Sequence, residues 1–397
     1  MKSLKYFSFL YLILLISCNN KEKEFQKEKH PIGVMAYYVP KQDYAIDQLP
    51  LDKLTHVIFS FSKVIGGKMK FNNTENDSLL RALVKQREKY PDLKVMIACG
   101  GWGADGFSDM SSTAENRQEF VNSAIDFVKT YNLDGIDIDW EYPTNSEANI
   151  DARDEDKENF THLMRELRQA LNTLKKTQIL TFASAGWEPY YDYIELNEVL
   201  KYVDYMNIMT YDYVGGSSKF TGHHSSLGLI EENDIIDTPM YDYLQEKKIK
   251  MDGNGEKIEL RSAEKIVDYC IDKGVKPEKI VIGAAFYCRS WKGVPPENNG
   301  LYQPNTGAYT VYSYDQIRRE FETKNNYQRY WDSIAKAPYL FNASDSIFMS
   351  YDDTLSVKLK TKYAIHNNLG GIMFWQLTND TKDEESLLQS IYDATKE

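Results

Sequence analysis

Three acidic residues alternate within the segment from Asp134 to Pro143, which reads Asp-Gly-Ile-Asp-Ile-Asp-Trp-Glu-Tyr-Pro. In a β-strand successive side chains point to opposite faces, so Asp137, Asp139 and Glu141 would share one face and the apolar residues between them the other. Carboxyl groups spaced about 6–7 Å apart repel one another when ionised, and burial adds to this effect. We therefore expect a raised pKa in this row and a protonated Glu141, which could act as a general acid.

A divalent metal site is the main alternative for such a cluster, because carboxylates bind magnesium and manganese. The other predicted strand ends carry Trp and Tyr rather than histidine or phosphate-binding loops, which weakens this alternative. His223 and His224 are the best histidine candidates, but adjacent side chains point in different directions on most backbones. We expect a structural or substrate-edge role for this pair, and no metal or other cofactor.

Eight short runs rich in β-branched and aromatic residues predict the strands that must position these acids. Helical patterns separate most of them, the clearest being an apolar stripe from Phe160 to Leu174, while another follows an expected capping box from Ser112 to Glu115. This alternation predicts an α/β fold that closes as a (β/α)8 barrel, with an open doubly wound sheet as the alternative. The runs cover residues 32–38, 56–61, 94–98, 135–140, 179–184, 203–210, 280–285 and 371–375.

In a (β/α)8 barrel the functional side chains gather at the carboxyl ends of the strands. For two tryptophans, Trp102 and Trp375, packing in the core is the alternative, and Arg289 could be a structural ion-pair partner. The residues that the pattern places at this end are Glu141, Met209, Tyr211, Asp212, Arg289 and Trp375, with Asp139 and Asp137 progressively deeper.

The segment between the seventh and eighth runs is too long for a simple βα connection and contains its own Tyr-rich alternating stretches. We expect residues 292–350 to form a small α+β domain inserted between strands 7 and 8. The barrel would then consist of residues 31–291 and 351–397.

The first residues predict export. Lys2 and Lys5 precede an apolar run over residues 7–16 that is too short to span a membrane, as in a signal peptide. Leu15-Ile16-Ser17-Cys18 resembles a bacterial lipobox, with an ordinary secretory signal as the alternative. We expect a lipoprotein signal peptide over residues 1–17, lipidation at Cys18 and a Lys- and Glu-rich flexible tether over residues 18–30. The protein would be membrane-anchored, in the periplasm or at the cell surface.

Composition restricts the partners. The formal net charge of −12 argues against nucleic acid and anionic lipid, because binding to either needs basic patches. Aromatic residues make up 13% of the chain, and rings with a polar edge suit the apolar faces of sugars. Cys99, Cys270 and Cys288 have spacings that indicate neither a disulfide framework nor a zinc site, so we expect buried thiols.

The acidic segment, Asp134-x-x-Asp137-x-Asp139-x-Glu141, resembles the signature of glycoside hydrolase family 18, the chitinases and their relatives. The similarity extends over about residues 31–395 and implies a (β/α)8 barrel with a chitinase insertion domain. Further segments that are similar to family segments, in the same order, are Thr55–Phe61, Gly100–Trp102, Met209–Asp212, Thr221–His224, Phe286–Trp291, Tyr351–Asp353 and Gly370–Trp375.

The resemblance also implies a retaining, substrate-assisted mechanism for hydrolysis of β-1,4 bonds between N-acetylglucosamine units in chitin or its oligosaccharides. Glu141 would protonate the glycosidic oxygen, and the 2-acetamido carbonyl of the substrate would attack the anomeric carbon. Asp139 would hold the acetamido N–H and share a proton with Asp137, and Tyr211 would donate to the acetamido carbonyl. The implied substrate-binding residues are Tyr37, Phe61, Trp102, Met209, Asp212, Arg289 and Trp375.

Two positions depart from the family pattern. Ala98 stands where a serine hydroxyl usually bonds the inner aspartate, so Asp137 would depend more on Tyr37, with a larger effect on the pH optimum than on activity. Cys288 replaces the usual Gly before Arg289 and would either crowd the pocket or lie buried as a small thiol. The alternatives to a chitinase are an endo-β-N-acetylglucosaminidase acting on the N-glycan core and a non-catalytic lectin that binds chitooligosaccharides.

Overall fold

The computed structural model describes residues 32–40, 45–250, 260–322 and 324–397. One compact unit spans Pro31–Glu397. The predicted signal peptide, the lipidation at Cys18 and the tether lie outside the described residues.

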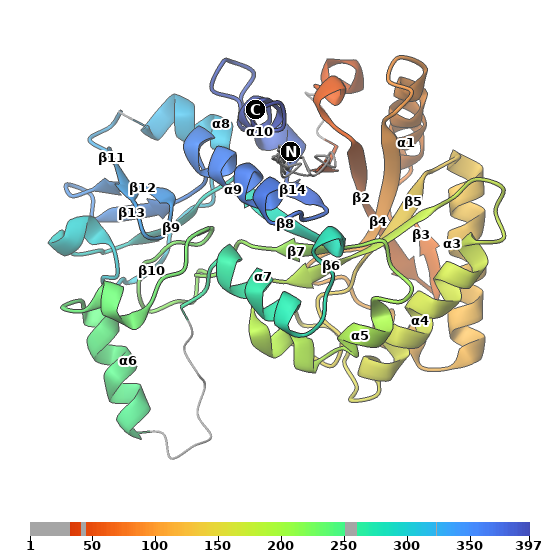
Figure 1. The fold of residues 1–397 in the computed structure, drawn as a ribbon, viewed down its shortest axis with the longest axis horizontal. Coiled ribbons are helices and arrows are strands. Elements are labelled where there is room, and N and C mark those ends of the chain that lie inside the picture. The colour runs from red at the N-terminus through yellow and green to blue at the C-terminus, as the bar shows by residue number, and fades with distance from the viewer. Residues whose placement is uncertain (1–31, 41–44, 251–259, 323) are drawn as a thin grey trace, which may run out of the picture. The chain divides into compact units, whose positions relative to one another are not determined.

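Eight parallel strands close into a barrel (Figure 1). Each predicted run forms one strand, and the last strand pairs with the first, so the (β/α)8 prediction is confirmed and the open sheet is wrong. In order around the barrel the strands are β1 (Gly33–Tyr38), β2 (His56–Ile65), β4 (Lys94–Gly100), β5 (Gly135–Asp139), β6 (Ile179–Ala185), β7 (Tyr205–Met209), β8 (Ile280–Ala285) and β14 (Gly371–Trp375).

The largest difference from the predicted strand boundaries is in β2, which continues past Phe61 to Ile65. There it forms a hairpin with β3 (Lys68–Lys70), in which Lys63 pairs with Lys70. This extension carries the strand beyond the rim of the barrel and brings Lys63 to the same end of the molecule as the acidic row.

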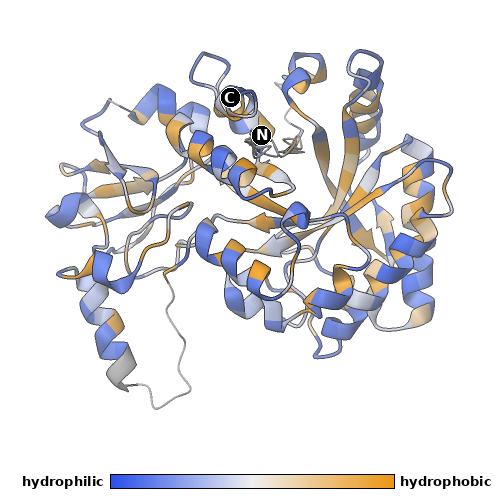
Figure 2. Ribbon diagram, viewed as in Figure 1, coloured by the Kyte–Doolittle hydropathy of each residue, from blue (hydrophilic) through white to orange (hydrophobic). Residues whose placement is uncertain are grey.

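Helices cover the outside of the barrel, with hydrophobic residues concentrated in the strands and hydrophilic residues on the outer helix faces (Figure 2). The stripe from Phe160 is confirmed in α4, although Leu174 lies beyond the helix end. The expected cap at Ser112 is wrong by one residue, because the Thr113 side chain accepts from the Asn116 backbone N–H. The helices are α1 (Glu75–Lys85), α2 (Phe107–Ser111), α3 (Ala114–Tyr131), α4 (Asp156–Leu171), α5 (Leu196–Val199), α6 (Pro239–Lys250), α7 (Ala263–Asp272), α8 (Tyr314–Gln316), α9 (Thr354–His366) and α10 (Leu387–Ala394).

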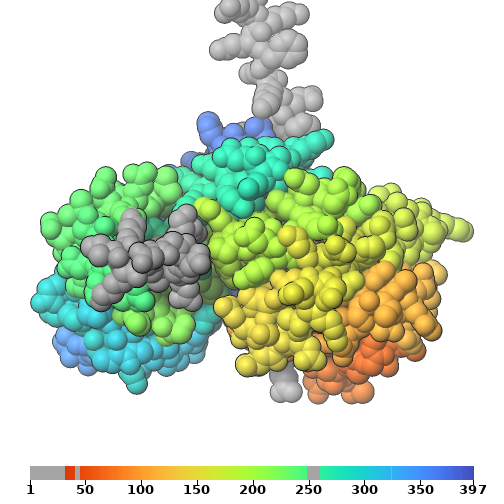
Figure 3. All heavy atoms as spheres, turned by 90° about the horizontal axis from the view of Figure 1, so that it is seen from below, coloured from red at the N-terminus to blue at the C-terminus, as the bar shows by residue number. Residues whose placement is uncertain are grey.

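A second, antiparallel sheet lies beside the barrel (Figure 1). It packs with α6, and the space-filling view from below shows this green segment side by side with the cyan and blue residues of the sheet (Figure 3). The sheet begins at Arg289, three residues before the predicted insertion, and we retain the predicted domain boundaries as a proposal. Its order is β10 (Gly307–Ala308), β9 (Arg289–Lys292), β13 (Ile347–Ser350), β12 (Ala337–Asn342) and β11 (Gln328–Asp332).

The alternation expected in the acidic segment is present in β5. Ile136, Ile138 and Trp140 pack in the large apolar core under the helices. Asp137 and Asp139 are buried on the opposite face, toward the barrel interior, where a smaller cluster includes Tyr37 and Tyr211. The fold therefore places two carboxyl groups inside the barrel, one beneath the other.

Candidate active site

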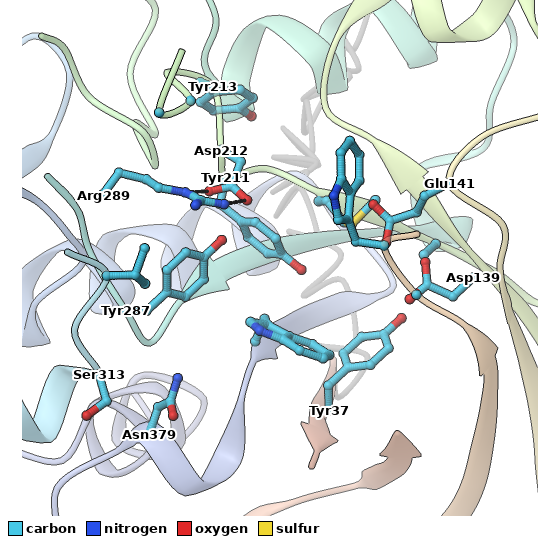
Figure 4. A pocket seen from close by; sticks show the side chains of 18 of the residues that line it. Tyr37, Asp139, Glu141, Tyr211, Asp212, Tyr213, Tyr287, Arg289, Ser313 and Asn379 are labelled. Atoms are coloured by element: carbon cyan, nitrogen blue, oxygen red, sulfur yellow. Dashed lines mark hydrogen bonds and ion pairs between the residues drawn. The ribbon is translucent and has the colours of Figure 1, made fainter. Parts of the chain in front are cut away.

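A cleft of about 1760 Å³ opens at the carboxyl ends of the barrel strands. Asp139, Glu141 and Tyr211 line it from the barrel, and Arg289 and Ser313 line it from the segment that contains the second sheet. Figure 4 shows these side chains around a common space, with Asp139 and Glu141 on one side and the Asp212–Arg289 pair on the other.

Asp137 lies deepest in the row and accepts three hydrogen bonds. Tyr37 Oη donates at 2.9 Å, Thr181 Oγ1 at 2.5 Å and Asn207 Nδ2 at 3.2 Å. Burial raises the pKa of Asp137 to about 6, although these donors oppose the rise. Ala98 is its register partner on β4, so the predicted reliance on Tyr37 was incomplete: Thr181 and Asn207 also donate where the serine hydroxyl is missing.

Asp139 and Glu141 lie above Asp137, toward the cleft. Oδ1 of Asp139 is buried without a hydrogen-bond partner among the described residues. Burial, followed by the charges of Glu141 and Asp137, raises the pKa of Asp139 well above its usual value. Burial also raises the pKa of Glu141 to about 7, with repulsion from Asp212 adding to it. The row therefore holds protons near neutral pH, as the alternating sequence predicted.

Asp212 faces this row in a very different environment. Both of its oxygens accept from Arg289, from Nε and Nη2, each at 2.7 Å, and His224 Nδ1 lies 3.4 Å from Oδ1. Burial alone would raise the pKa of Asp212, but these partners outweigh it and lower the pKa. Arg289 begins β9 of the second sheet and is not part of β8, so its ion pair with Asp212 joins the second sheet to the barrel in the cleft wall.

Aromatic rings form the floor and rim of the cleft. Trp375 stacks on Phe61, with centroids 5.5 Å apart and an interplanar angle of 22°, and Tyr37 packs 5.9 Å away. Trp102 is 64% exposed at the rim, so core packing is the wrong interpretation for this residue. Met209 also lines the cleft, as predicted.

Several other candidates lie away from the reacting centre. His223 is buried and its Nε2 lies 3.0 Å from Asp332, whereas His224 contacts Asp212, so the two histidines contact different carboxyl groups. Within the described ranges, no three His, Cys, Asp or Glu side chains are grouped as a metal site. Cys288 is fully buried and its sulfur contacts the Thr310 carbonyl and the Tyr312 N–H, so the alternative of a small buried thiol is confirmed. The buried thiols are confirmed at Cys99, Cys270 and Cys288.

Sequence reasoning missed several residues that line the cleft or hold the acidic row. Strand alternation could have placed Thr181 inside the barrel, but its pairing with Asp137 depends on the register between β5 and β6. Lys63 lies beyond the predicted end of its strand, and Trp187 lies in the loop after β6. The missed residues are Lys63, Tyr142, Thr181, Trp187, Arg261 and Tyr287.

The closed barrel and its cleft define a class of protein: a (β/α)8 barrel with a row of proton-sharing carboxyl groups beneath an aromatic-lined cleft suited to sugars. The model of glycosyl hydrolases family 18 matches residues 33–380. The chain belongs to this family, as the sequence resemblance indicated.

Named relatives agree with this assignment. Chitinase A1 of Niallia circulans is 36% identical over 76% of this chain, and the match spans 42% of that protein. Chitotriosidase-1 of Mus musculus is 31% identical over 82% of this chain and 67% of its own. A solved structure described as a family 18 N-acetylglucosaminidase from Paenibacillus barengoltzii has a TM-score of 0.78 and 36% identity, covering 91% of this chain and 99% of that one.

Proposed function

We propose that the protein is a retaining, chitinase-type hydrolase that cleaves β-1,4 bonds between N-acetylglucosamine units with assistance from the substrate. The observation that carries this proposal is the row of Asp137, Asp139 and Glu141, in which the two aspartates are buried and the half-buried Glu141 faces the cleft with a pKa of about 7. A glycosidic oxygen needs an acid that is still protonated at working pH, and Glu141 meets this requirement.

The nucleophile is the second part of the argument. A two-carboxylate retaining enzyme needs an ionised carboxylate about 5–5.5 Å from the acid, across the sugar. Asp139 lies deeper than Glu141 in the same row and has a raised pKa. Both oxygens of Asp212 accept hydrogen bonds from Arg289. Neither is suited to attack carbon, which supports the acetamido carbonyl of the substrate as nucleophile.

In this mechanism the acetamido oxygen bonds to the anomeric carbon as the bond from that carbon to the glycosidic oxygen breaks. Glu141 gives its proton to the departing oxygen, and the sugar becomes an oxazolinium ion. Water then adds to the anomeric carbon and gives a proton to the Glu141 carboxylate, while the bond from that carbon to the acetamido oxygen breaks and the oxazolinium ring opens. Two inversions at the same carbon retain the β configuration.

Two polar groups are suited to hold the acetamido group. The unpartnered Oδ1 of Asp139 would accept its N–H and, once ionised, stabilise the positive charge of the oxazolinium ion. The Tyr211 hydroxyl reaches only the Met373 sulfur, at 3.9 Å, among the described residues and would donate to the acetamido carbonyl. Trp375 would carry the apolar face of the sugar.

The bond to be broken must lie beside Glu141. We place the leaving sugars along Tyr142 and Trp102, whose rings are 6.4 Å apart. The sugar chain on the other side of the cleaved bond extends past Trp375 toward Ser313 and Asn379. The exposed indole of Trp102 then provides a stacking surface for the leaving group.

Incubation of the protein with chitohexaose tests the proposal, with Glu141→Gln as the matched control. Early proton NMR spectra should show shorter β-anomers from the wild type alone. Release of single sugars alone would indicate an exo-acting N-acetylglucosaminidase, the activity named for the Paenibacillus structure. Hexaose that binds uncut would indicate a lectin, and hexaose that does not bind would move the test to an N-glycan core.

We also propose that residues 292–350 form a chitinase insertion domain and that the protein is an exported lipoprotein. In the described part of the chain, every helix is too short or too polar to cross a bilayer. Labelling with radioactive palmitate during bacterial expression should mark the wild type and leave Cys18→Ala unlabelled. Equal labelling of both would exclude Cys18 as the lipidation site.

A further inference from the structure

Lys63 brings a positive charge into the cleft close to the acidic row. It lies in the part of β2 that extends past Phe61, and its side chain lines the cleft. Its Nζ donates to the carbonyl of Gly100 at 2.5 Å and lies 4.9 Å from the centre of the Phe61 ring. Burial lowers the pKa of Lys63, but the negative charges of Asp139 and Glu141 oppose this fall. The carbonyl and the aromatic face also favour the charged ammonium, since each attracts a cation.

The Gly100 carbonyl lies immediately beside Asp139. Gly100 is the register partner of Asp139 on β4, and the Gly101 N–H donates to the Asp139 carbonyl at 2.8 Å. A Cβ added to Gly100 would lie 1.9 Å from that carbonyl oxygen, so the two backbones touch. An ammonium held on Gly100 is therefore held near the Asp139 backbone, and its charge acts on the Asp139 and Glu141 carboxyl groups without a direct ion pair to either.

Other cations also line the cleft, namely Arg261, Arg289, Arg319 and Lys382, but the positive charge that acts on Asp139 and Glu141 is that of Lys63. Arg289, also in the cleft, directs Nε and Nη2 to Asp212. Lys63 acts on both Asp139 and Glu141 and opposes the rise of their pKa values. The titratable groups that face the row or Lys63 from the packed elements are Asp137, Asp212, Cys99, Tyr37, Tyr142, Tyr190 and Tyr211, which are neutral or negative.

We propose that Lys63 is a positioning residue for the reaction: its ammonium, fixed on the Gly100 carbonyl, keeps one negative charge on the row formed by Asp137, Asp139 and Glu141. This inference rests on the proposed function. Without a cation, two buried carboxyl groups and the half-buried Glu141 would tend to become fully protonated, and Asp139 would lack the charge that stabilises the oxazolinium ion. With Lys63 present, the three carboxyl groups of the row would together hold two protons and one negative charge.

The test is the pH profile of kcat/KM on an aryl chitobioside, measured for the wild type, Lys63→Met and Lys63→Arg. Loss of the cation raises the pKa of Asp139 and Glu141, so both limbs should move to higher pH, by roughly half a unit to one unit. The ratio of the rate at about pH 5 to that at about pH 8 should then fall roughly ten-fold, and Lys63→Arg should restore the profile. Lys68→Met is the control, because it removes a charge from the same hairpin where Lys68 pairs with Glu119 outside the cleft.

A uniformly slower Lys63→Met enzyme with unmoved limbs would overturn the proposal, since that is the effect of a purely structural residue. If Lys63→Met does not fold, Lys63→Gln makes the same comparison, because it keeps a donor for Gly100 and removes the charge. Carbon NMR titration of the Asp and Glu carboxyl groups gives a readout that needs no turnover. It should show the same upward shift even if the wild type proves to be a lectin, and unchanged carboxyl pKa values would contradict the role of Lys63.

Discussion

The two walls of the cleft contain half-buried carboxyl groups whose pKa values move in opposite directions. On one wall burial raises the pKa of Glu141 to about 7. On the other, Asp212 is also half-buried, yet two hydrogen bonds from Arg289 outweigh the effect of burial and lower its pKa. Burial acts in the same direction in both places, so the partner decides the outcome. The same chemical group, a carboxyl, is thus a proton donor at Glu141 and a permanent anion at Asp212.

The largest effect that this contrast predicts is on Glu141. Glu141→Gln removes the transferable proton and leaves the shape unchanged, so kcat should fall by about 10²- to 10⁴-fold. Steady-state rates on an aryl chitobioside measure this fall. Binding of chitohexaose, followed by calorimetry, should persist; full activity in the variant would assign the acid to another residue.

Substitution of Asp212 on the opposite wall should lower activity less than substitution of Glu141. Asp212→Asn leaves Arg289 with a neutral partner and loosens the junction between β7 and β9, so we expect a fall in kcat/KM of roughly ten- to a hundredfold. It also removes a negative charge that repels Glu141, so the basic limb of the pH profile should move to lower pH. A basic limb that stays in place would show that Asp212 does not influence the proton on Glu141.

Removing the charge of Glu141 and removing that of Asp212 should change the melting temperature in opposite directions. The raised pKa of Glu141 means that folding binds a proton at neutral pH, so Glu141 destabilises the fold progressively as pH rises through its range. Glu141→Gln should therefore melt a few degrees higher than wild type at about pH 8. At about pH 4 the two proteins should melt at the same temperature.

Asp212 has the reverse sign, because its pKa is lowered in the folded protein. Its stabilisation is present above the pKa of an unfolded aspartate and is lost as pH falls. Asp212→Asn should melt a few degrees lower than wild type at about pH 8, with a smaller difference under acid conditions. Calorimetric melting across pH measures both variants, and shifts of the same sign would refute the contrast.

The smallest expected effect is at Ala98, opposite Asp137. Ala98→Ser would add a fourth donor to a carboxyl group that already accepts from Tyr37, Thr181 and Asn207. The acid limb should move to lower pH by a few tenths of a unit, with little change in kcat at the optimum. A large gain in kcat would mean that the missing hydroxyl limits turnover itself.

The parts of this site that follow local rules could be predicted from the sequence. Alternation along one strand placed Asp137, Asp139 and Glu141 on a single face, and repeated strand and helix patterns predicted the barrel. The partners that tune the row could not be predicted in this way. Thr181 and Lys63 act on it through strand register and a hairpin extension, which are properties of distant segments in contact.

Arg289 and Trp102 illustrate the same limit. A motif indicated that both belong to the site, but not that Arg289 begins a second sheet or that Trp102 stands exposed at the rim. Residue type and spacing do not determine in which strand Arg289 lies or how exposed Trp102 is. Both depend on how segments distant in the sequence pack together.

The most direct test of substrate assistance is to weaken the acetamido oxygen as a nucleophile. We would measure kcat/KM for aryl N-acetylglucosaminides in which the acetyl group carries no, one, two or three fluorine atoms, each of which withdraws electrons from that oxygen. Attack by the acetamido group predicts a steep, progressive fall in rate along the series. A flat series would contradict it and would require a protein carboxylate as the nucleophile.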